Sequence, residues 1–193
     1  MRSQYPDPVG GIVWVTNDDP NMAPFVPLNC CITEMPKCFR RIEGEQDDVT
    51  FSWESAFWVQ NAVSNMVYPY YEKMFPDVLK QRKEMEEGID DMHLEDYPLQ
   101  LLKEQGRGAM VKYMNEASLI RSNMMLARWQ HLFEYLMVKH LDMATKKVEA
   151  DDPLLNRFKK TEHGIAAPPL RPGYSEAFRK QMIKETGDKY LMK

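Results

Sequence analysis

The chain has 193 residues, 44% of them apolar and 28% charged, so it is long enough to bury the core of one domain. Its net charge of −4 gives no electrostatic reason to expect a nucleic-acid partner. No apolar run reaches the roughly 18 residues that a membrane span requires, so we expect no membrane partner. The sequence leaves the cellular compartment unassigned.

The first zone, residues 1–50, has the pattern of strands and loops. A β-rich run, Ile12–Thr16, follows two glycines, and Asn17–Asn21 is dense in turn-forming residues. Ala23–Thr33 indicates a second strand, which two prolines interrupt. We expect the two strands to pair as a hairpin with an irregular connection. Because two strands alone are marginal in water, a larger sheet should lie beside them.

The second zone, residues 51–148, is helical. Ser52 is a candidate N-cap for its first helix. Apolar residues then recur at helical spacing and predict one buried face, while four polar residues fall largely elsewhere. The apolar positions are Ala56, Val59, Val63, Met66 and Tyr70, and the polar ones are Gln60, Asn61, Ser64 and Asn65. Pro69 cannot donate a backbone hydrogen bond, so we expect a kink or break there.

Prolines and glycines also predict the later helix limits. Pro76 suits the first position of a helix that ends at about Glu87, before Gly88. Another segment opens at Pro98 and is interrupted near Gly106 and Gly108. A longer helix should then span roughly residues 109–142. Most of the 15 methionines lie in these helical stretches, where a flexible thioether fills gaps in a core.

The third zone, residues 149–193, is a tail. Ala166–Gly173 is rich in proline and should be extended, and Ser175 should cap a short helix, Glu176–Glu185. The three zones form a single unit over residues 1–193, which we expect to be a fragment of a larger domain.

No pattern predicts a metal or another cofactor. Glu87, Asp90, Asp91 and His93 resemble a metal cluster, but nothing fixes their geometry and a solvated acidic turn explains them. His131 and Glu134 share a helix face in the order opposite to that of di-metal bundles. The three cysteines, Cys30, Cys31 and Cys38, are too few for a disulfide scaffold, and the sequence assigns them no role.

Several segments together carry a resemblance to a known family. They are GGIVWVTNDDPNMAPFVPLNCC (10–31), WESAFWVQNAVSNMVYPYY (53–71), FEYLMVKHLD (133–142) and PPLRPGYSEAFRKQMIKETGDKYLMK (168–193). With them the chain resembles the C-terminal part of the cysteine dipeptidases related to dipeptidase A and the secernins, which are N-terminal-nucleophile hydrolases.

The resemblance implies an α+β fold that is predominantly helical in this chain. It would be the C-terminal portion of an αββα sandwich, with a short β-hairpin followed by long helices. In the family, an N-terminal cysteine attacks a dipeptide amide, and its own amine serves as the base. Here Met1 is followed by Arg2, so that position is not matched, and we expect no catalytic residue in this chain.

Three residues are candidates for substrate binding. Arg2 stands where the family has an arginine before the first strand, and a guanidinium can hold a carboxylate through two hydrogen bonds. Asn21 in the turn and Asn61 on the first helix are possible polar groups of the pocket. The alternatives are a turn cap for Asn21 and a surface amide for Asn61.

The sequence therefore predicts the C-terminal portion of a cysteine-type dipeptidase, inactive alone because the nucleophile belongs to a missing N-terminal segment. Its partners would be that segment and, in the full-length protein, a dipeptide. The alternative is a non-catalytic helical module for protein interaction, derived from the hydrolase scaffold. An isolated fragment would expose the edge of its sheet and should form homo-oligomers.

Overall fold

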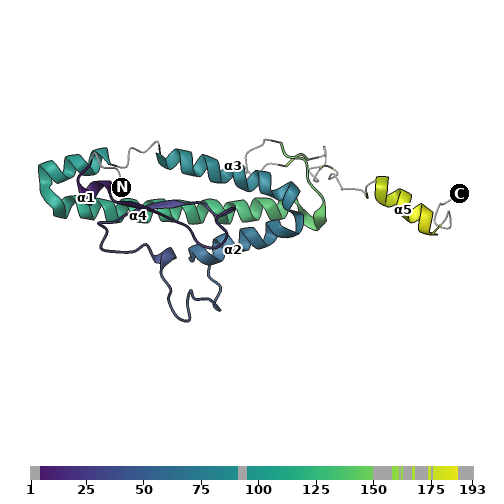
Figure 1. Ribbon diagram of the computed structural model, residues 1–193, viewed down its shortest axis with the longest axis horizontal. Coiled ribbons are helices and arrows are strands. Elements are labelled where there is room, and N and C mark those ends of the chain that lie inside the picture. Colours follow the sequence, from purple (N-terminus) through teal and green to yellow (C-terminus); the bar gives the residue numbers. More distant parts are fainter. Residues whose placement is uncertain are drawn as a thin grey trace.

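A computed structural model describes residues 5–90, 95–149, 158–160, 162, 167, 174 and 176–186. The elements in chain order are α1 (Asp7–Gly10), β1 (Ile12–Val15), β2 (Val26–Asn29), the 3-10 turn η1 (Lys37–Phe39), α2 (Ala56–Val67), the 3-10 turn η2 (Tyr68–Tyr70), α3 (Tyr71–Asp90), α4 (Asp96–Lys139), the 3-10 turn η3 (Leu141–Met143) and α5 (Glu176–Thr186). The predicted α+β fold, mostly helical with a hairpin before long helices, is confirmed (Figure 1). Within the described residues, no helix is long and apolar enough to cross a membrane.

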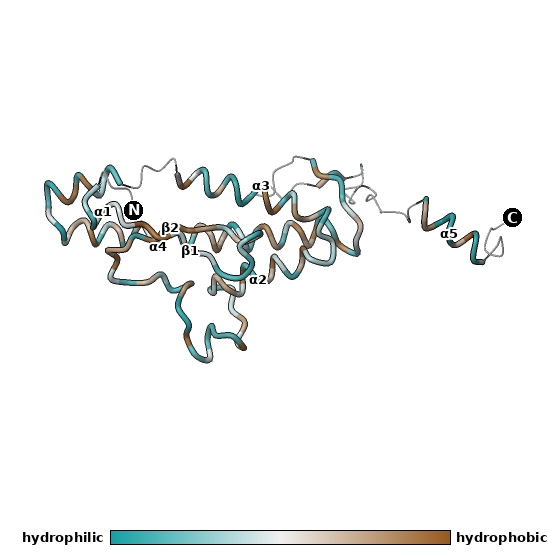
Figure 2. Tube along the Cα trace, viewed as in Figure 1, coloured by the Kyte–Doolittle hydropathy of each residue, from teal (hydrophilic) through white to brown (hydrophobic). Residues whose placement is uncertain are grey.

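The predicted hairpin is present and lies along α4 (Figure 1). Its strands are antiparallel, with Ile12 opposite Asn29 and Val15 opposite Val26. All four residues of β2 are buried, whereas the middle of β1 is exposed. The hydropathy colouring places apolar residues along the hairpin where it runs beside α4 (Figure 2). The second strand is shorter than the predicted Ala23–Thr33, and Pro27 lies within it, opposite Trp14.

The chain reverses between α2 and α3 at Pro69, where the predicted break occurs as the 3-10 turn η2 (Figure 1). Three other predicted limits are wrong. The first helix begins at Ala56 with Ser55 as its N-cap residue, because the Ser52 hydroxyl instead accepts a hydrogen bond from the Glu54 N–H in a preceding turn.

Pro76 lies inside α3 and not at its first position, because the chain already re-enters a helix at Tyr71 directly after η2. The same helix continues through Gly88 to Asp90 instead of ending at Glu87.

The main core lies where α2, α3 and α4 pack against the hairpin. Its largest fully buried side chains include Trp129 and Tyr135 of α4. The predicted face of α2 is confirmed at Ala56, Val59 and Val63, which are fully buried. Methionines fill the core as expected, among them Met22, Met74, Met85 and Met125.

The predicted interruption of the long helix is confirmed at Gly106, whose φ of 81° and ψ of −179° are not helical, whereas Gly108 lies within the helix. This positive φ is a conformation that glycine adopts readily and other residues do not. The helix changes direction there (Figure 1). A second, smaller core forms beside this bend from Val9, Leu101, Met110 and Met114.

A buried charged cluster joins α3 to the end of α4. Lys139 Nζ donates to both carboxylate oxygens of Asp77 at 2.8 and 2.7 Å, and His140 Nε2 lies 3.4 Å from Asp77 Oδ2. Burial opposes ionisation of Asp77, but the hydrogen bonds from His140 and Lys139 outweigh it and lower the pKa of this carboxyl. Burial also acts against the charge of Lys139, yet Asp77 raises the pKa of the ammonium.

The last described helix, α5, has no buried residue. It spans Glu176–Thr186, close to the predicted Glu176–Glu185. Ser175, its predicted cap, lies outside the described residues, as does nearly all of the predicted extended segment Ala166–Gly173.

Candidate functional site

The turn between the two strands is fastened to α2 through Asp18. Its φ of 59° is in the left-handed region, which aspartate adopts more readily than most residues. Asn61 Nδ2 donates to Asp18 Oδ1 at 2.8 Å, and the Ser64 hydroxyl donates to Asp18 Oδ2. These bonds to a carboxylate fix the direction in which the turn leaves β1.

Two further side chains complete the Asp18–Asn21 turn. Asp19 Oδ1 accepts a hydrogen bond from the Asn21 backbone N–H at 2.9 Å, as in an Asx turn. The Tyr68 hydroxyl donates to Asp19 Oδ2, and this hydrogen bond raises the pKa of the phenol. Asn21 Nδ2 donates to the Tyr71 hydroxyl at 3.0 Å. The turn is therefore tied to η2 and to the start of α3.

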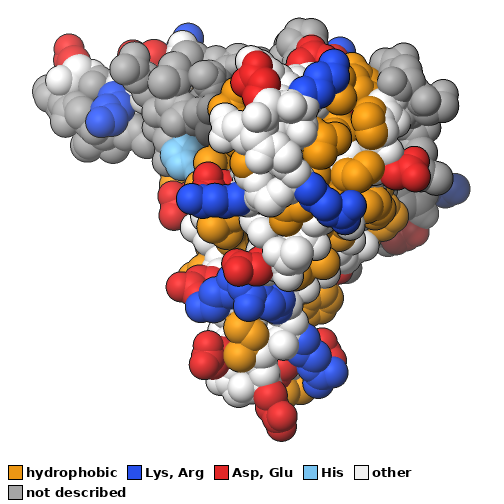
Figure 3. Space-filling view, turned by 90° about the vertical axis from the view of Figure 1, so that its left-hand side faces the viewer, with side chains coloured by type: hydrophobic (Ala, Val, Ile, Leu, Met, Phe, Trp, Pro, Cys, Tyr) orange, Lys and Arg blue, Asp and Glu red, His pale blue; other side chains and the backbone are white. Residues whose placement is uncertain are grey.

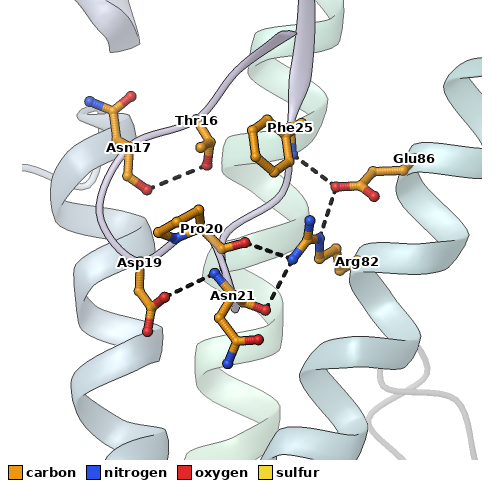
Figure 4. Close-up of polar contacts among 8 residues, drawn as sticks. All are labelled: Thr16, Asn17, Asp19, Pro20, Asn21, Phe25, Arg82 and Glu86. Carbon is orange, nitrogen blue, oxygen red and sulfur yellow. Dashed lines mark hydrogen bonds and ion pairs between the residues drawn. The ribbon is translucent and has the colours of Figure 1, made fainter.

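Arg82 of α3 holds the far end of the same turn (Figure 4). Its Nη1 donates to the carbonyl oxygens of Pro20 and Asn21 at 2.7 and 3.0 Å. Its Nε donates to Glu86 at 3.0 Å, and that carboxylate also accepts the Phe25 backbone N–H at 3.0 Å. One guanidinium thus connects the turn, α3 and the approach to β2.

Beside this turn, Asn17 connects α2 to a cavity. The Asn17 backbone N–H donates to Gln60 Oε1 at 2.8 Å, and Gln60 is only 1% exposed. The Oδ1 atom of Asn17 is buried and has no hydrogen-bond partner among the described residues. The cavity has a volume of about 150 Å³ and is lined by Asn17, Cys38, Phe39, Arg40, Arg41, Gln46, Asp47, Asp48, Ser55 and Phe57.

Hydrogen bonds within the loop between β2 and α2 shape the wall of this cavity. Asp47 accepts from the backbone N–H groups of Gly44 at 2.7 Å and Val49 at 3.0 Å, and these bonds lower the pKa of its carboxyl to about 2. Gln46 Nε2 donates to the carbonyl oxygens of Lys37 and Arg40, both at 2.6 Å. Short-range polar bonds therefore order a loop that has little regular structure.

The cavity contains charges of both signs. Arg41 lies 3.5 Å from Asp48 in an exposed ion pair. Arg40, by contrast, forms no ion pair with any described residue, and its side chain is exposed. This loop is the lower lobe of the molecule in Figure 3, where basic and acidic side chains are interspersed. The cavity can thus offer the exposed Arg40 guanidinium to an anionic group, whereas the Asn17 Oδ1 atom beside it is buried.

The thiol in the cavity is poorly suited to attack a substrate. Cys38 is 4% exposed, and burial raises the pKa of its thiol to about 11, although a hydrogen bond with Ser122 acts in the opposite direction. The thiolate is the reactive form, so this side chain is protonated near neutral pH. Burial also raises the pKa of Cys31. Cys30 is exposed and does not line the cavity.

The structure brings two of the three predicted site residues, Asn21 and Asn61, to the same turn, with Asn21 in the turn and Asn61 contacting it from α2. Asn61 bonds to Asp18 and Asn21 bonds to Tyr71, so both amides support the turn that precedes the strand β2. Their role toward a substrate stays a prediction. Arg2 lies outside the described residues.

Sequence reasoning missed Asn17, Arg40 and Gln60. Gln60 and Ser64 were expected away from the buried face, but each is only 1% exposed, because α2 packs against the turn as well as against the core. The dense run of turn formers at Asn17–Asn21 was the available signal, since such a turn needs polar partners on neighbouring elements.

The potential metal ligands are not grouped. Among the described residues, no three His, Cys, Asp or Glu side chains lie together so that they could hold a metal ion. His131 Nδ1 and Glu134 Oε2 lie 3.8 Å apart, in agreement with the prediction that the two side chains share a helix face. Asp91 and His93 of the acidic turn lie outside the described residues.

Residues 1–84 match the sequence model of peptidase family C69, the family of dipeptidase A and the secernins. The predicted resemblance is therefore confirmed for this part of the chain, and the match supports a peptidase-family origin. No curated protein and no solved structure matches the chain. The resemblance of the segments beyond residue 84 stays a prediction. All ten residues that line the cavity fall inside the matched segment.

Proposed function

We propose that this chain forms the substrate-binding part of a cysteine-type dipeptidase whose nucleophile lies in another segment, and that the chain alone cleaves no dipeptide. One observation carries the proposal. The segment that matches a peptidase family also supplies every residue around the cavity between the Asn17 turn and the loop before α2. A site built wholly from the peptidase-related segment is the natural place for a peptidase substrate.

The groups around the cavity suit the ends of a dipeptide. A dipeptide carries a carboxylate, which Arg40 can bind because its guanidinium has no ion-pair partner among the described residues. It also carries an ammonium and amide N–H groups, for which the unpaired Asn17 Oδ1 is an acceptor. In this proposal Arg40 and Asn17 orient the substrate and take no part in bond cleavage.

The properties of the cysteines in this chain favour a nucleophile that lies in another segment. The Cys38 thiol has a pKa of about 11 and is protonated at neutral pH. Of the described histidines, His140 contacts Asp77 and Thr145, so its imidazole is already engaged in the buried cluster. By resemblance to the family, an N-terminal cysteine elsewhere would attack instead, with its own amine as the base. That thiol adds to the amide carbon, the proton passes through the amine to the departing nitrogen, and water then hydrolyses the thioester.

A dipeptide panel tests the proposal. The 193-residue chain and a longer form that carries the N-terminal cysteine would be assayed side by side for release of free amino acids. We expect turnover by the longer form only, and loss of that turnover when its N-terminal cysteine is changed to alanine. Turnover by the 193-residue chain that disappears in Cys38→Ala would contradict the proposal.

A longer form with an intact N-terminal cysteine but no turnover on any dipeptide would also contradict it. That result would favour the non-catalytic interaction module instead.

A further inference from the structure

A second cavity lies between α3 and α4, outside the peptidase-type site. Its volume is about 120 Å³, well below the roughly 300 Å³ at which pockets for drug-sized ligands begin. It is lined by Glu84, Met85, Gly88, Ile89, Arg121, Met124 and Arg128. None of these residues lines the cavity beside Asn17. Its size admits a small molecule or ion.

Arg121 is a buried cation at this cavity whose partners are all neutral. The residue is 6% exposed. Its Nε donates to the Pro27 carbonyl oxygen at 3.3 Å, and its Nη2 donates to Asn29 Oδ1 at 2.8 Å and to the Ser118 hydroxyl at 3.3 Å. No described carboxylate forms an ion pair with it, and its Nη1 hydrogen-bonds to no described residue. Buried charges in proteins are normally paired, but no described residue supplies a counter-charge to this guanidinium.

Arg128 contributes a second guanidinium to the same cavity. Its Nη2 donates to Glu84 Oε2 at 2.8 Å and its Nε donates to Gln81 Oε1 at 2.9 Å. Gln81 Nε2 also donates to the same oxygen of Glu84 at 3.0 Å. Among the described residues, the only carboxylate in the lining therefore already forms an ion pair with Arg128. The described lining thus has two cations and one anion, which leaves one positive charge without a described counter-charge.

The remaining wall is apolar and formed by three side chains, Met85, Ile89 and Met124. A monoanion with a short alkyl group matches both parts of the lining. Its carboxylate would meet the guanidinium groups, for which a planar pair of oxygens is a good partner. Its alkyl group would contact the thioethers and the isoleucine. A phosphate dianion would match neither the single excess charge nor the apolar wall.

We propose that the cavity between α3 and α4 binds a short-chain monocarboxylate, with its oxygens on Arg121 and Arg128 and its alkyl group against Met85, Ile89 and Met124. This site is independent of the proposed dipeptidase function. It explains why the chain keeps a guanidinium inside a helical layer without an acidic partner.

Thermal unfolding of the 193-residue chain with sodium butyrate, acetate, phosphate and chloride tests the site. All solutions have the same ionic strength, so that general screening is constant. Because a ligand that binds only the folded state raises Tm, we expect a saturating rise with butyrate, a smaller one with acetate and none beyond chloride with phosphate. Titration calorimetry with butyrate then gives the affinity.

Two variants locate the binding. Arg121→Gln should abolish the response to butyrate, whereas Arg107→Gln, an exposed arginine of the same helix, should leave it unchanged. Because Arg121→Gln removes hydrogen bonds to the hairpin and could prevent folding, Arg128→Gln serves as the second variant. It should weaken butyrate binding by about tenfold or more, since it removes one hydrogen bond to a charged group.

Equal Tm values in butyrate and chloride would overturn the proposal. An undiminished butyrate response in Arg128→Gln would also overturn it. A larger rise with phosphate than with butyrate would refute the assignment of a carboxylate.

Discussion

The turn region and the helical body of this protein are held together by different forces. Hydrogen bonds hold the Asp18–Asn21 turn in place. Asn61 of α2 donates to Asp18, Tyr68 of η2 donates to Asp19, and Arg82 of α3 donates to the Pro20 carbonyl oxygen. The body is fixed by apolar packing around α4, where Trp129 and Tyr135 are fully buried. Packing is tolerant of small shifts in position, but directional bonds to charged groups are not. The turn that borders the proposed substrate site is therefore held mainly by directional hydrogen bonds.

The largest loss of stability should come from a substitution in the core of the helical body. Trp129→Ala removes a fully buried indole, and we expect the free energy of unfolding to fall by about 3–5 kcal/mol. Urea denaturation followed by circular dichroism measures the change. Val49→Ala is the control, since Val49 is 90% exposed and should change stability by less than about 0.5 kcal/mol. A loss below about 1 kcal/mol in Trp129→Ala would mean that this core does not carry the fold.

The second-largest loss of stability should come from a substitution that releases the Asp18–Asn21 turn. Arg82→Met keeps much of the stem but removes the donors to Pro20, Asn21 and Glu86, and we expect a loss of about 1.5–3 kcal/mol. Lys83→Met on the same helix is the matched control, because its ion pair with Glu87 at 3.7 Å is exposed. Equal stability of the two variants would show that the carbonyl contacts of Arg82 contribute nothing.

Acid should weaken the link between α3 and α4. The folded pKa of Asp77 lies below its unfolded value, so its contribution is complete above that unfolded value of about 3.9 and is lost as pH falls through the folded pKa. We expect the free energy of unfolding, measured by urea titration from pH 6 to 2.5, to fall mainly below pH 4. Asp77→Asn should flatten that decline without removing it, since Asp47 also has a lowered pKa, of about 2. An unchanged acid profile in this variant would contradict the assignment.

The smallest effect on stability concerns the cavity. Arg40→Gln alters an exposed side chain without an ion pair among the described residues, so stability should change by less than about 0.5 kcal/mol. Binding of a dipeptide should nevertheless weaken by about tenfold, because a charged hydrogen bond to its carboxylate is lost. Chemical-shift titration with alanylalanine compares this variant with Arg107→Gln. Equal affinities would exclude Arg40 as the carboxylate contact.

Much of the body could be predicted from the sequence. The periodicity of Ala56, Val59 and Val63 predicted the buried face of α2, and the special backbone chemistry of Pro69 and Gly106 predicted the breaks in the helices. These signals are local, because they depend on residues a few positions apart. The exact start of α2 was not predictable, since Ser52 and Ser55 both suit an N-cap and only the preceding turn selects between them.

The candidate site was less accessible to the same reasoning. The contact of Asn17 with Gln60 joins residues 43 positions apart, and that of Pro20 with Arg82 joins residues 62 apart. Hydropathy treats Gln60 as a surface residue, although a buried amide is stable when its hydrogen bonds are met. The turn was recognisable from its composition, but its partners on α2 and α3 were not.

The bend at Gly106 divides α4 into a shorter arm before it and a longer arm after it. The two arms differ in the size of the apolar cluster that they pack into. Among the described residues, the shorter arm packs through Leu101 into the small cluster around Val9 and Met114, whereas the longer arm also contributes to the main core. Because regions with fewer buried apolar contacts open at a lower free energy, we expect local opening of the shorter arm to require less free energy than opening of the longer one. A single non-helical residue thereby separates a weakly packed arm from the main core at the end of the molecule opposite α5 (Figure 1).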